Sequence, residues 1–180
     1  MLKIKQLDTI GLDTHSQLCD LLTVCIEHGA SLGFYTPVNS DMLQQYWYSV
    51  AQAIATKERK LYALYRGDAL VATVQLSLCM KENGRHRADV EKLLVHPNTQ
   101  RRGYATILMR HMEQSALENG RTLLVLDTQS TDKAELFYQA FGYTKVGQIP
   151  FYVSDNQGQL HSTSYYYKYL AHGTACLNVN

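Results

Sequence analysis

A strand, a glycine-containing loop, a helix and a second strand between residues 90 and 126 constrain the fold most strongly. Residues 90–95 read as a strand that stops at His96-Pro97, because proline cannot donate to the hydrogen-bond ladder of a sheet. A helical period of apolar residues follows, and the continuous apolar run at 122–126 is typical of a fully buried parallel strand. Two strands joined through a helix pair in parallel by a right-handed crossover. The unit therefore predicts a sheet covered by helices.

The segments ahead of this unit predict another strand, two helices and a hairpin. Residues 2–5 alternate apolar and polar side chains, as a half-buried strand does. Helical periods begin near Asp13 or Thr14 and at Ser40, which we expect to cap them. Strands at 61–65 and 70–78 flank a turn at Gly67-Asp68, so they form an antiparallel hairpin.

The remainder predicts a short helix and two final strands. Thr131 or Asp132 is expected to cap the helix, which ends near Gly142, and the strands occupy 143–146 and 164–170. This order belongs to the α+β class, or three-layer α/β, with a mixed, mostly antiparallel central sheet flanked by helices. With 180 residues, 46% of them hydrophobic, and no repeat or linker, residues 1–180 are expected to form one domain.

The charge and the cysteine and histidine spacing of the chain limit the kinds of partner and cofactor that we expect it to bind. A formal net charge of +1 with scattered basic residues favours neither nucleic acid nor an anionic membrane surface, and no stretch approaches the roughly 20 apolar residues of a membrane span. The four cysteines form no CxxC pair, and the seven histidines show no HExxH spacing. We therefore expect a cytoplasmic protein with reduced thiols and without a metal.

The loop at residues 100–105 has the properties of a phosphate-binding loop. Backbone N–H groups and the positive dipole end of a helix can bind pyrophosphate, provided that side chains there are small. Gly103 and Ala105 meet this condition just before the helix, and Arg101 and Arg102 add positive charge. Neither GxGxxG nor the GxxxxGK[ST] pattern is present. The alternative is a simple loop-to-helix turn with solvated arginines.

Gln100, Gly103 and Ala105 match the pattern of Gln or Arg, two residues, Gly, one residue, and Gly or Ala. With the flanking segments 91–97 and 134–143, the chain resembles the GNAT superfamily of N-acetyltransferases. The resemblance implies a GNAT-like sheet with a splayed parallel strand pair, and acetyl-CoA as the acyl donor. The implied cofactor-binding residues are Leu93, Leu94, Val95, Gln100, Arg101, Arg102, Gly103, Tyr104, Ala105 and Thr106.

A closer resemblance is suspected to the tabtoxin-resistance acetyltransferase group. It rests on segments 72–84, 126–128, 137–138, 143–147 and 158–161. One departure from the superfamily is Thr131, which stands where many members have asparagine. That difference puts a cofactor contact from this position in doubt.

Three residues are candidates for proton transfer. The resemblance implies Tyr138 as the general acid for the departing thiolate; alternatively it is a packed core tyrosine. Asp127 ranks first as the base because it interrupts a buried strand, where a carboxylate is costly unless paired. Asp89 ranks second, and Glu91, on the same strand face, is a lesser candidate. Asp89 and Asp127 are expected at opposite ends of parallel strands, connected at most through water, and each could instead be a capping or solvated residue.

For the acceptor, the resemblance points to the aromatic loops at Phe34-Tyr35 and Phe151-Tyr152, although such residues often only pack. We therefore expect transfer of an acetyl group from acetyl-CoA to a primary amine, with a small amino-acid-like molecule as acceptor. Two alternatives stay open: a protein N-terminus or lysine as acceptor, and a non-catalytic acyl-CoA-binding module. A homodimer through the terminal strands is also compatible with the resemblance.

Overall fold

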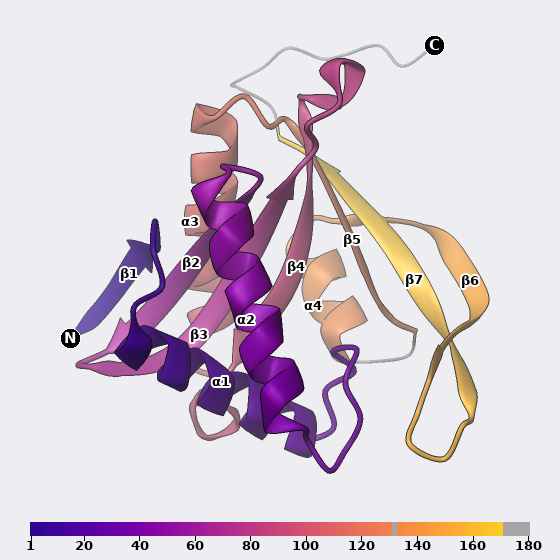
Figure 1. Ribbon diagram of the computed structural model, residues 1–180. Coiled ribbons are helices and arrows are strands. Elements are labelled where there is room, and N and C mark those ends of the chain that lie inside the picture. The colour runs from indigo at the N-terminus through magenta and orange to yellow at the C-terminus, as the bar shows by residue number, and fades with distance from the viewer. Residues whose placement is uncertain (131–132, 171–180) are drawn as a thin grey trace.

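A computed structural model describes residues 1–130 and 133–170, and its centre is one seven-stranded sheet (Figure 1). The strands follow the spatial order β1-β2-β3-β4-β5-β7-β6. Only β4 and β5 are parallel, which confirms the predicted mixed, mostly antiparallel sheet. The bounds are β1 Leu2–Gln6, β2 Arg59–Arg66, β3 Ala69–Leu78, β4 Arg87–Val95, β5 Leu123–Gln129, β6 Thr144–Ser154 and β7 Leu160–Tyr169.

Helices cover both faces of this sheet. α1 (Leu12–Glu27) and α2 (Ser40–Ala55) pack on one face, and α3 (Tyr104–Glu118) and α4 (Lys133–Ala140) on the other (Figure 1). Strand alternation divides the core accordingly: Leu61 packs with α1 and α2, whereas its neighbour Tyr62 packs beneath α3. Among the described residues, no helix is long and apolar enough to cross a membrane.

The helix starts differ from the predicted ones. Gly11, in extended conformation, is the N-cap of α1, and Asn39 rather than Ser40 caps α2. The Asn39 Oδ1 accepts hydrogen bonds from the N–H groups of Asp41 (3.0 Å) and Met42 (3.2 Å). A cap must itself be non-helical, and Ser40 is already helical. The predicted caps of α4, Thr131 and Asp132, lie outside the described residues, as does the position of the family asparagine.

The last two strands, β6 and β7, are longer than the sequence predicted. Most residues of β6, which is an edge strand, are exposed, so its apolar residues do not follow the pattern of a buried face from which its length could be predicted. On β7 the tyrosines alternate as expected. Tyr166 is fully buried, and Tyr165 and Tyr167 lie on the opposite face.

The parallel pair separates soon after it begins. β4 and β5 pair only at Arg87 with Leu123, Ala88 with Leu124 and Asp89 with Val125. The two strands then diverge, and α4 is visible in the gap between them (Figure 1). The predicted position of Asp89 and Asp127 at opposite ends is wrong, because this register places Asp127 only two residues beyond the partner of Asp89, on the same face.

A bulge interrupts β4 beside this gap. The register between β3 and β4 shifts so that Gln75 faces Glu91 while Thr73 faces Leu94, and Lys92 and Leu93 have no regular partners. Lys92 has a φ of 48°, in the left-handed region that non-glycine residues seldom adopt. Bulges of this kind change the direction in which side chains point.

Candidate active site

The predicted phosphate loop borders a cavity of about 460 Å³ between the end of β4, the start of α3 and α4. Two of the predicted cofactor residues, Leu94 and Arg102, are not among its lining residues, and the Leu94 side chain packs with α1 and α2. The other eight predicted cofactor residues line it: Leu93, Val95, Gln100, Arg101, Gly103, Tyr104, Ala105 and Thr106.

The start of α3 is suited to binding a pyrophosphate. Gly103 is its N-cap, with a φ of 78° and no side-chain cap, and the first intrahelical bond runs from Ile107 N–H to the Gly103 carbonyl (3.0 Å). The N–H groups of residues 104–106 therefore have no acceptor within the helix. A Cβ on Gly103 would meet nothing within 4 Å, so backbone conformation rather than crowding selects glycine. The residues present fit the donor that the resemblance implied.

A second cavity, of about 330 Å³, lies where β4 and β5 diverge, and we call it the acceptor cavity. Its lining combines Glu91, Lys92 and Leu93 of β4 with Asp127 of β5 and Thr163 of β7. Residues 30–33 of the α1–α2 loop and residues of α4 complete it. Only three residues line both this cavity and the one at α3: Leu93, Ala134 and Tyr138. The two cavities therefore meet at the gap in the sheet.

Tyr138 reaches this meeting point from the α3/α4 face. It is 9% exposed, and its ring packs against Tyr143 (centroids 5.9 Å apart) and Tyr166 (6.4 Å). The adjacent Phe137 ring completes this setting at 5.5 Å. These contacts restrict the orientation of the phenol beside both cavities.

The two carboxylates differ in their relation to the acceptor cavity. Asp127 lines it, and its Oδ2 accepts a hydrogen bond from the Thr163 hydroxyl (2.9 Å). The expectation that Asp127 is buried is wrong, because the sheet opens here and leaves the side chain exposed. Asp89 does not line the cavity. Partial desolvation, together with the charges of Glu91 and Asp127, raises the pKa of Asp89.

A polar network beneath α2 was not predicted. Arg59 of β2 binds Glu91 through both terminal nitrogens, Nη1 to Oε2 at 2.8 Å and Nη2 to Oε1 at 3.4 Å. The fully buried Gln75 accepts a hydrogen bond from Arg59 and pairs with the Tyr46 hydroxyl. Burial raises the pKa of Tyr46 to about 12. A glutamine inside the apolar strand at 70–78 was the available signal.

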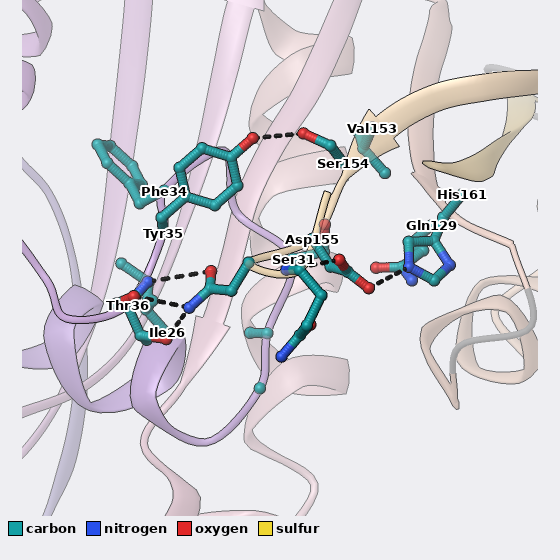
Figure 2. A pocket seen from close by; sticks show the side chains of 14 residues that line it. Ile26, Ser31, Phe34, Tyr35, Thr36, Gln129, Val153, Ser154, Asp155 and His161 are labelled. Atoms are coloured by element: carbon teal, nitrogen blue, oxygen red, sulfur yellow. Dashed lines mark hydrogen bonds and ion pairs between the residues drawn. The ribbon is translucent and has the colours of Figure 1, made fainter. Parts of the chain in front are cut away.

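Phe34 and Tyr35 line a further cavity of about 430 Å³, the outer cavity (Figure 2). It shares Ala30, Ser31, Gln129 and Val153 with the acceptor cavity, so the two are continuous. Tyr152 lines neither of them.

The hydroxyl of Tyr152 pairs instead with that of Tyr165 at 2.9 Å. This hydrogen bond, burial and the nearby carboxylates of Asp127 and Asp89 raise the pKa of Tyr165 to about 12. Tyr152 is therefore bonded to Tyr165, the residue that faces Asp127 across β5 and β7, and does not itself line either cavity.

The α1–α2 loop and the β6–β7 hairpin are joined across the outer cavity, and we call this contact the clasp (Figure 2). The Tyr35 hydroxyl bonds to Ser154 Oγ. Asn156 Oδ1 accepts from the Thr36 N–H (3.2 Å), and its Nδ2 donates to the Thr36 carbonyl (2.7 Å) and hydroxyl. The clasp connects segments about 120 residues apart in the chain.

A contact between a histidine and an aspartate in the hairpin also borders the outer cavity and was not predicted. His161 Nε2 lies 2.8 Å from Asp155 Oδ2, and Asp155 Oδ1 accepts from the N–H groups of Gln157 and Gln159. The hydrogen bond from His161, with those from the backbone, lowers the pKa of Asp155. Within residues 1–130 and 133–170 there is no group of three His, Cys, Asp or Glu side chains that could hold a metal ion.

A helix N-terminus suited to pyrophosphate and a second cavity that meets it through a split sheet define a group-transfer enzyme with a phosphate-bearing donor. Residues 21–143 match the sequence model of the acetyltransferase (GNAT) family, and the chain belongs to this family. Its members are acetyl-CoA-dependent acetyltransferases, and the chain is therefore an enzyme of this kind rather than a non-catalytic module.

Solved structures support the fold. An N-acetyltransferase from Staphylococcus aureus Mu50 superposes with a TM-score of 0.78 at 12% identity, covering 95% of this chain and 99% of the other. The yncA protein of Salmonella typhimurium, solved with its cofactor acetyl-CoA, gives 0.75 at 15% identity, covering 99% of both chains. Ribosomal-protein-alanine N-acetyltransferase of Brucella melitensis gives 0.76 at 14% identity, covering 93% and 99%.

Proposed function

We propose that the chain acetylates the primary amine of a small, amino-acid-like molecule at the junction of its two cavities. The observation that carries this proposal is that Leu93, Ala134 and Tyr138 line both cavities. A donor at α3 and an acceptor in the gap between β4 and β5 would meet beside these residues. The resemblance to the tabtoxin-resistance group agrees with an amino-acid-like acceptor.

Acetyl-CoA supplies an acetyl thioester when bound. The N–H groups at the start of α3, with Arg101, would hold its pyrophosphate, and Leu93 and Val95 would lie beside its acyl arm. Backbone N–H groups in the β4 bulge are suited to polarise the thioester carbonyl, because donors aimed at a developing oxyanion lower the barrier.

Proton transfer requires one acceptor and one donor. The Asp127 carboxylate, oriented by Thr163, accepts the proton of the incoming ammonium directly or through water. The neutral amine forms the new N–C bond as the C–S bond breaks. The Tyr138 hydroxyl gives its proton to the departing sulfur, and the nitrogen loses its surplus proton to the resulting tyrosinate, directly or through water, which leaves a neutral amide and restores the phenol. Asp89 lies on the same face of the sheet and is the second candidate for the base, connected to Asp127 through water.

The clasp favours a small acceptor over a protein. It joins the α1–α2 loop to the β6–β7 hairpin, so an extended polypeptide laid across the outer cavity would collide with it. The Brucella enzyme is named for a ribosomal protein, so the fold alone does not select the acceptor. A protein N-terminus is the second candidate, because one chain end could enter beside the clasp.

The test is a thiol-release screen with acetyl-CoA across amino acids, polyamines, aminoglycosides and peptides, with the products identified by mass spectrometry. We expect turnover with free amino acids or close analogues. Turnover with peptides alone would replace the small acceptor by a protein, and no thiol release from any amine would reject the proposal.

Tyr138→Phe tests the site itself. Loss of a general acid lowers kcat by roughly 100-fold, while acetyl-CoA binding measured by calorimetry stays unchanged. Tyr167→Phe is the matched control, because the Tyr167 side chain is 40% exposed and lines neither cavity. Undiminished turnover in Tyr138→Phe would remove this residue from the mechanism.

A further inference from the structure

Lys92 occupies an unusual place in the acceptor cavity. It lies in the β4 bulge with left-handed backbone geometry, and it lines the cavity together with Asp127 of β5. Among the described residues that line this cavity, it is the only cationic one. Backbone strain of this kind persists where the surrounding structure maintains it, and it is frequent at ligand-binding sites.

No anionic group in the part of the chain that the structure describes forms an ion pair with this ammonium. Across residues 1–130 and 133–170, the Lys92 side chain forms no ion pair within 4 Å, and its contact is with the Tyr46 ring, 5.7 Å from Nζ to the centroid. Glu91, the nearest carboxylate in sequence, is bound through both oxygens by Arg59. Asp127 accepts a hydrogen bond from Thr163.

Burial of the Lys92 ammonium is unfavourable for the stability of the folded protein. Desolvation lowers the pKa of Lys92, and the Arg59 charge acts in the same direction, against the opposing effects of Glu91 and Asp127. A largely buried cation without an anion destabilises the folded protein. Such a group is retained when a ligand supplies the missing charge, which makes it a marker of a binding site.

The charges of the cavity therefore match a zwitterion. Asp127 offers a carboxylate for an ammonium group, and Lys92 offers an ammonium for an anion on the same molecule. We propose that Lys92 binds the carboxylate of the acceptor, so that the substrate is a free amino acid whose amine faces Asp127 and Tyr138. Polyamines and aminoglycosides carry only positive charge and would be repelled by Lys92. This inference rests on the proposed function and narrows its substrate class.

The experiment compares matched acceptors on matched variants. The best amino acid in the thiol-release screen is assayed beside its carboxamide and its decarboxylated amine, with wild type, Lys92→Met, Lys92→Arg and Lys5→Met. Lys5 is the control because its Nζ also lies over a tyrosine ring, 5.0 Å from the Tyr65 centroid, but on β1 and outside both cavities.

In the wild type, we expect kcat/KM to be at least roughly 10-fold higher for the amino acid than for its amide, as a charged hydrogen bond provides. Lys92→Met should bring this ratio close to one, Lys92→Arg should restore part of it, and Lys5→Met should leave it unchanged. Calorimetric titration of the amino acid into the enzyme without acetyl-CoA should show the same order of affinities.

The outcomes separate the two proposals. A wild-type enzyme that uses the amide as well as the acid, or a Lys92→Met variant that loses both equally with an unchanged ratio, would overturn the role of Lys92 while leaving acetyl transfer intact. Absence of thiol release with every amine would instead reject the proposed function. Unfolding temperatures of the four proteins show whether a loss arises from misfolding.

Discussion

Asp127 and Tyr138 approach the proposed reaction from opposite faces of the sheet, which they can do only because β4 and β5 separate between them. Asp127 lies on the α1/α2 face with Thr163, and Tyr138 extends from α4 among aromatic rings. Lys92, in the bulge of β4, is a third residue that lines the acceptor cavity. Each role thus depends on where a side chain points, and the same residue types elsewhere would have no such role.

Replacement of Asp127 by Asn tests the choice of base. We expect kcat/KM to fall by roughly 100-fold near pH 7 and the acidic limb of its pH profile to disappear, because no carboxylate then accepts the ammonium proton. Asp89→Asn should retain the acidic limb with a smaller loss, since Asp89 does not line the acceptor cavity. An acidic limb that survives in Asp127→Asn would move the base to another group.

The raised pKa of Asp89 predicts how the stability of the protein depends on pH. Folding raises the pKa of Asp89 above the ordinary aspartate value. In the pH window just above that ordinary value, the folded protein therefore binds more protons than the unfolded protein. The free energy of unfolding consequently declines as the pH rises through this window. Asp89→Asn should therefore raise the unfolding temperature at pH 7 but not at pH 3. Thermal unfolding at the two pH values measures this, and an equal shift at both would contradict the electrostatic cause.

At the scale of elements, the clasp and the hairpin behind it shape the entrance to the acceptor cavity. The turn of the hairpin is held by Asp155, which accepts hydrogen bonds from His161 and from two backbone N–H groups. Asn156 then bonds to both the N–H and the carbonyl of Thr36, much as an added strand would. The Asn156 side chain thereby joins the α1–α2 loop to the β6–β7 hairpin in the way that backbone hydrogen bonds join neighbouring strands.

Loss of the clasp should widen the range of acceptors. Asn156→Ala removes the bonds to Thr36, so we expect KM for the small acceptor to rise a few-fold and peptide acetylation to increase relative to wild type. The matched control is Gln159→Ala, an exposed residue of the same hairpin whose backbone N–H and carbonyl, both kept in alanine, hydrogen-bond to Asp155. Steady-state assays with both acceptors test this, and unchanged selectivity would show that the clasp does not limit access.

At the scale of the whole molecule, the edge formed by β6 is exposed and apolar. Val146, Ile149 and Phe151 of β6 are 68%, 44% and 73% exposed, and among the described strands β6 has a neighbour on one side only. Unpaired edges with apolar side chains favour association between chains. The predicted homodimer through the terminal strands is compatible with this surface.

Light scattering after gel filtration tests the dimer. We expect wild type at twice the 20.4 kDa chain mass, and Phe151→Asp at the monomer mass because a charge is placed in the apolar edge. Leu12→Asp, which alters an 89% exposed residue on α1, should remain dimeric. A monomeric wild type would reject the association, and a dimeric Phe151→Asp would place it on another surface.

Local patterns were enough to predict the class of fold, most elements and the cofactor loop. Apolar periods follow from which face of a helix or strand is buried, and the Gly103 loop precedes its helix directly in the chain. Family motifs pointed to Tyr138, which lines both cavities, and its role as the general acid stays a prediction. These patterns involve residues that are close together in the sequence, so they can be recognised without knowledge of the tertiary structure.

Tertiary structure alone decided what surrounds the site. The register of β4 and β5, the Arg59 pair with Glu91, the clasp and the position of Lys92 in the acceptor cavity all join residues distant in sequence or depend on the bulge in β4. Asp127 lines the acceptor cavity, but the burial on which its ranking as the base rested is wrong, and its role as the base stays a prediction. Sequence periodicity reports the preferences of each segment, whereas charge pairing and cavity shape arise only when the segments pack together.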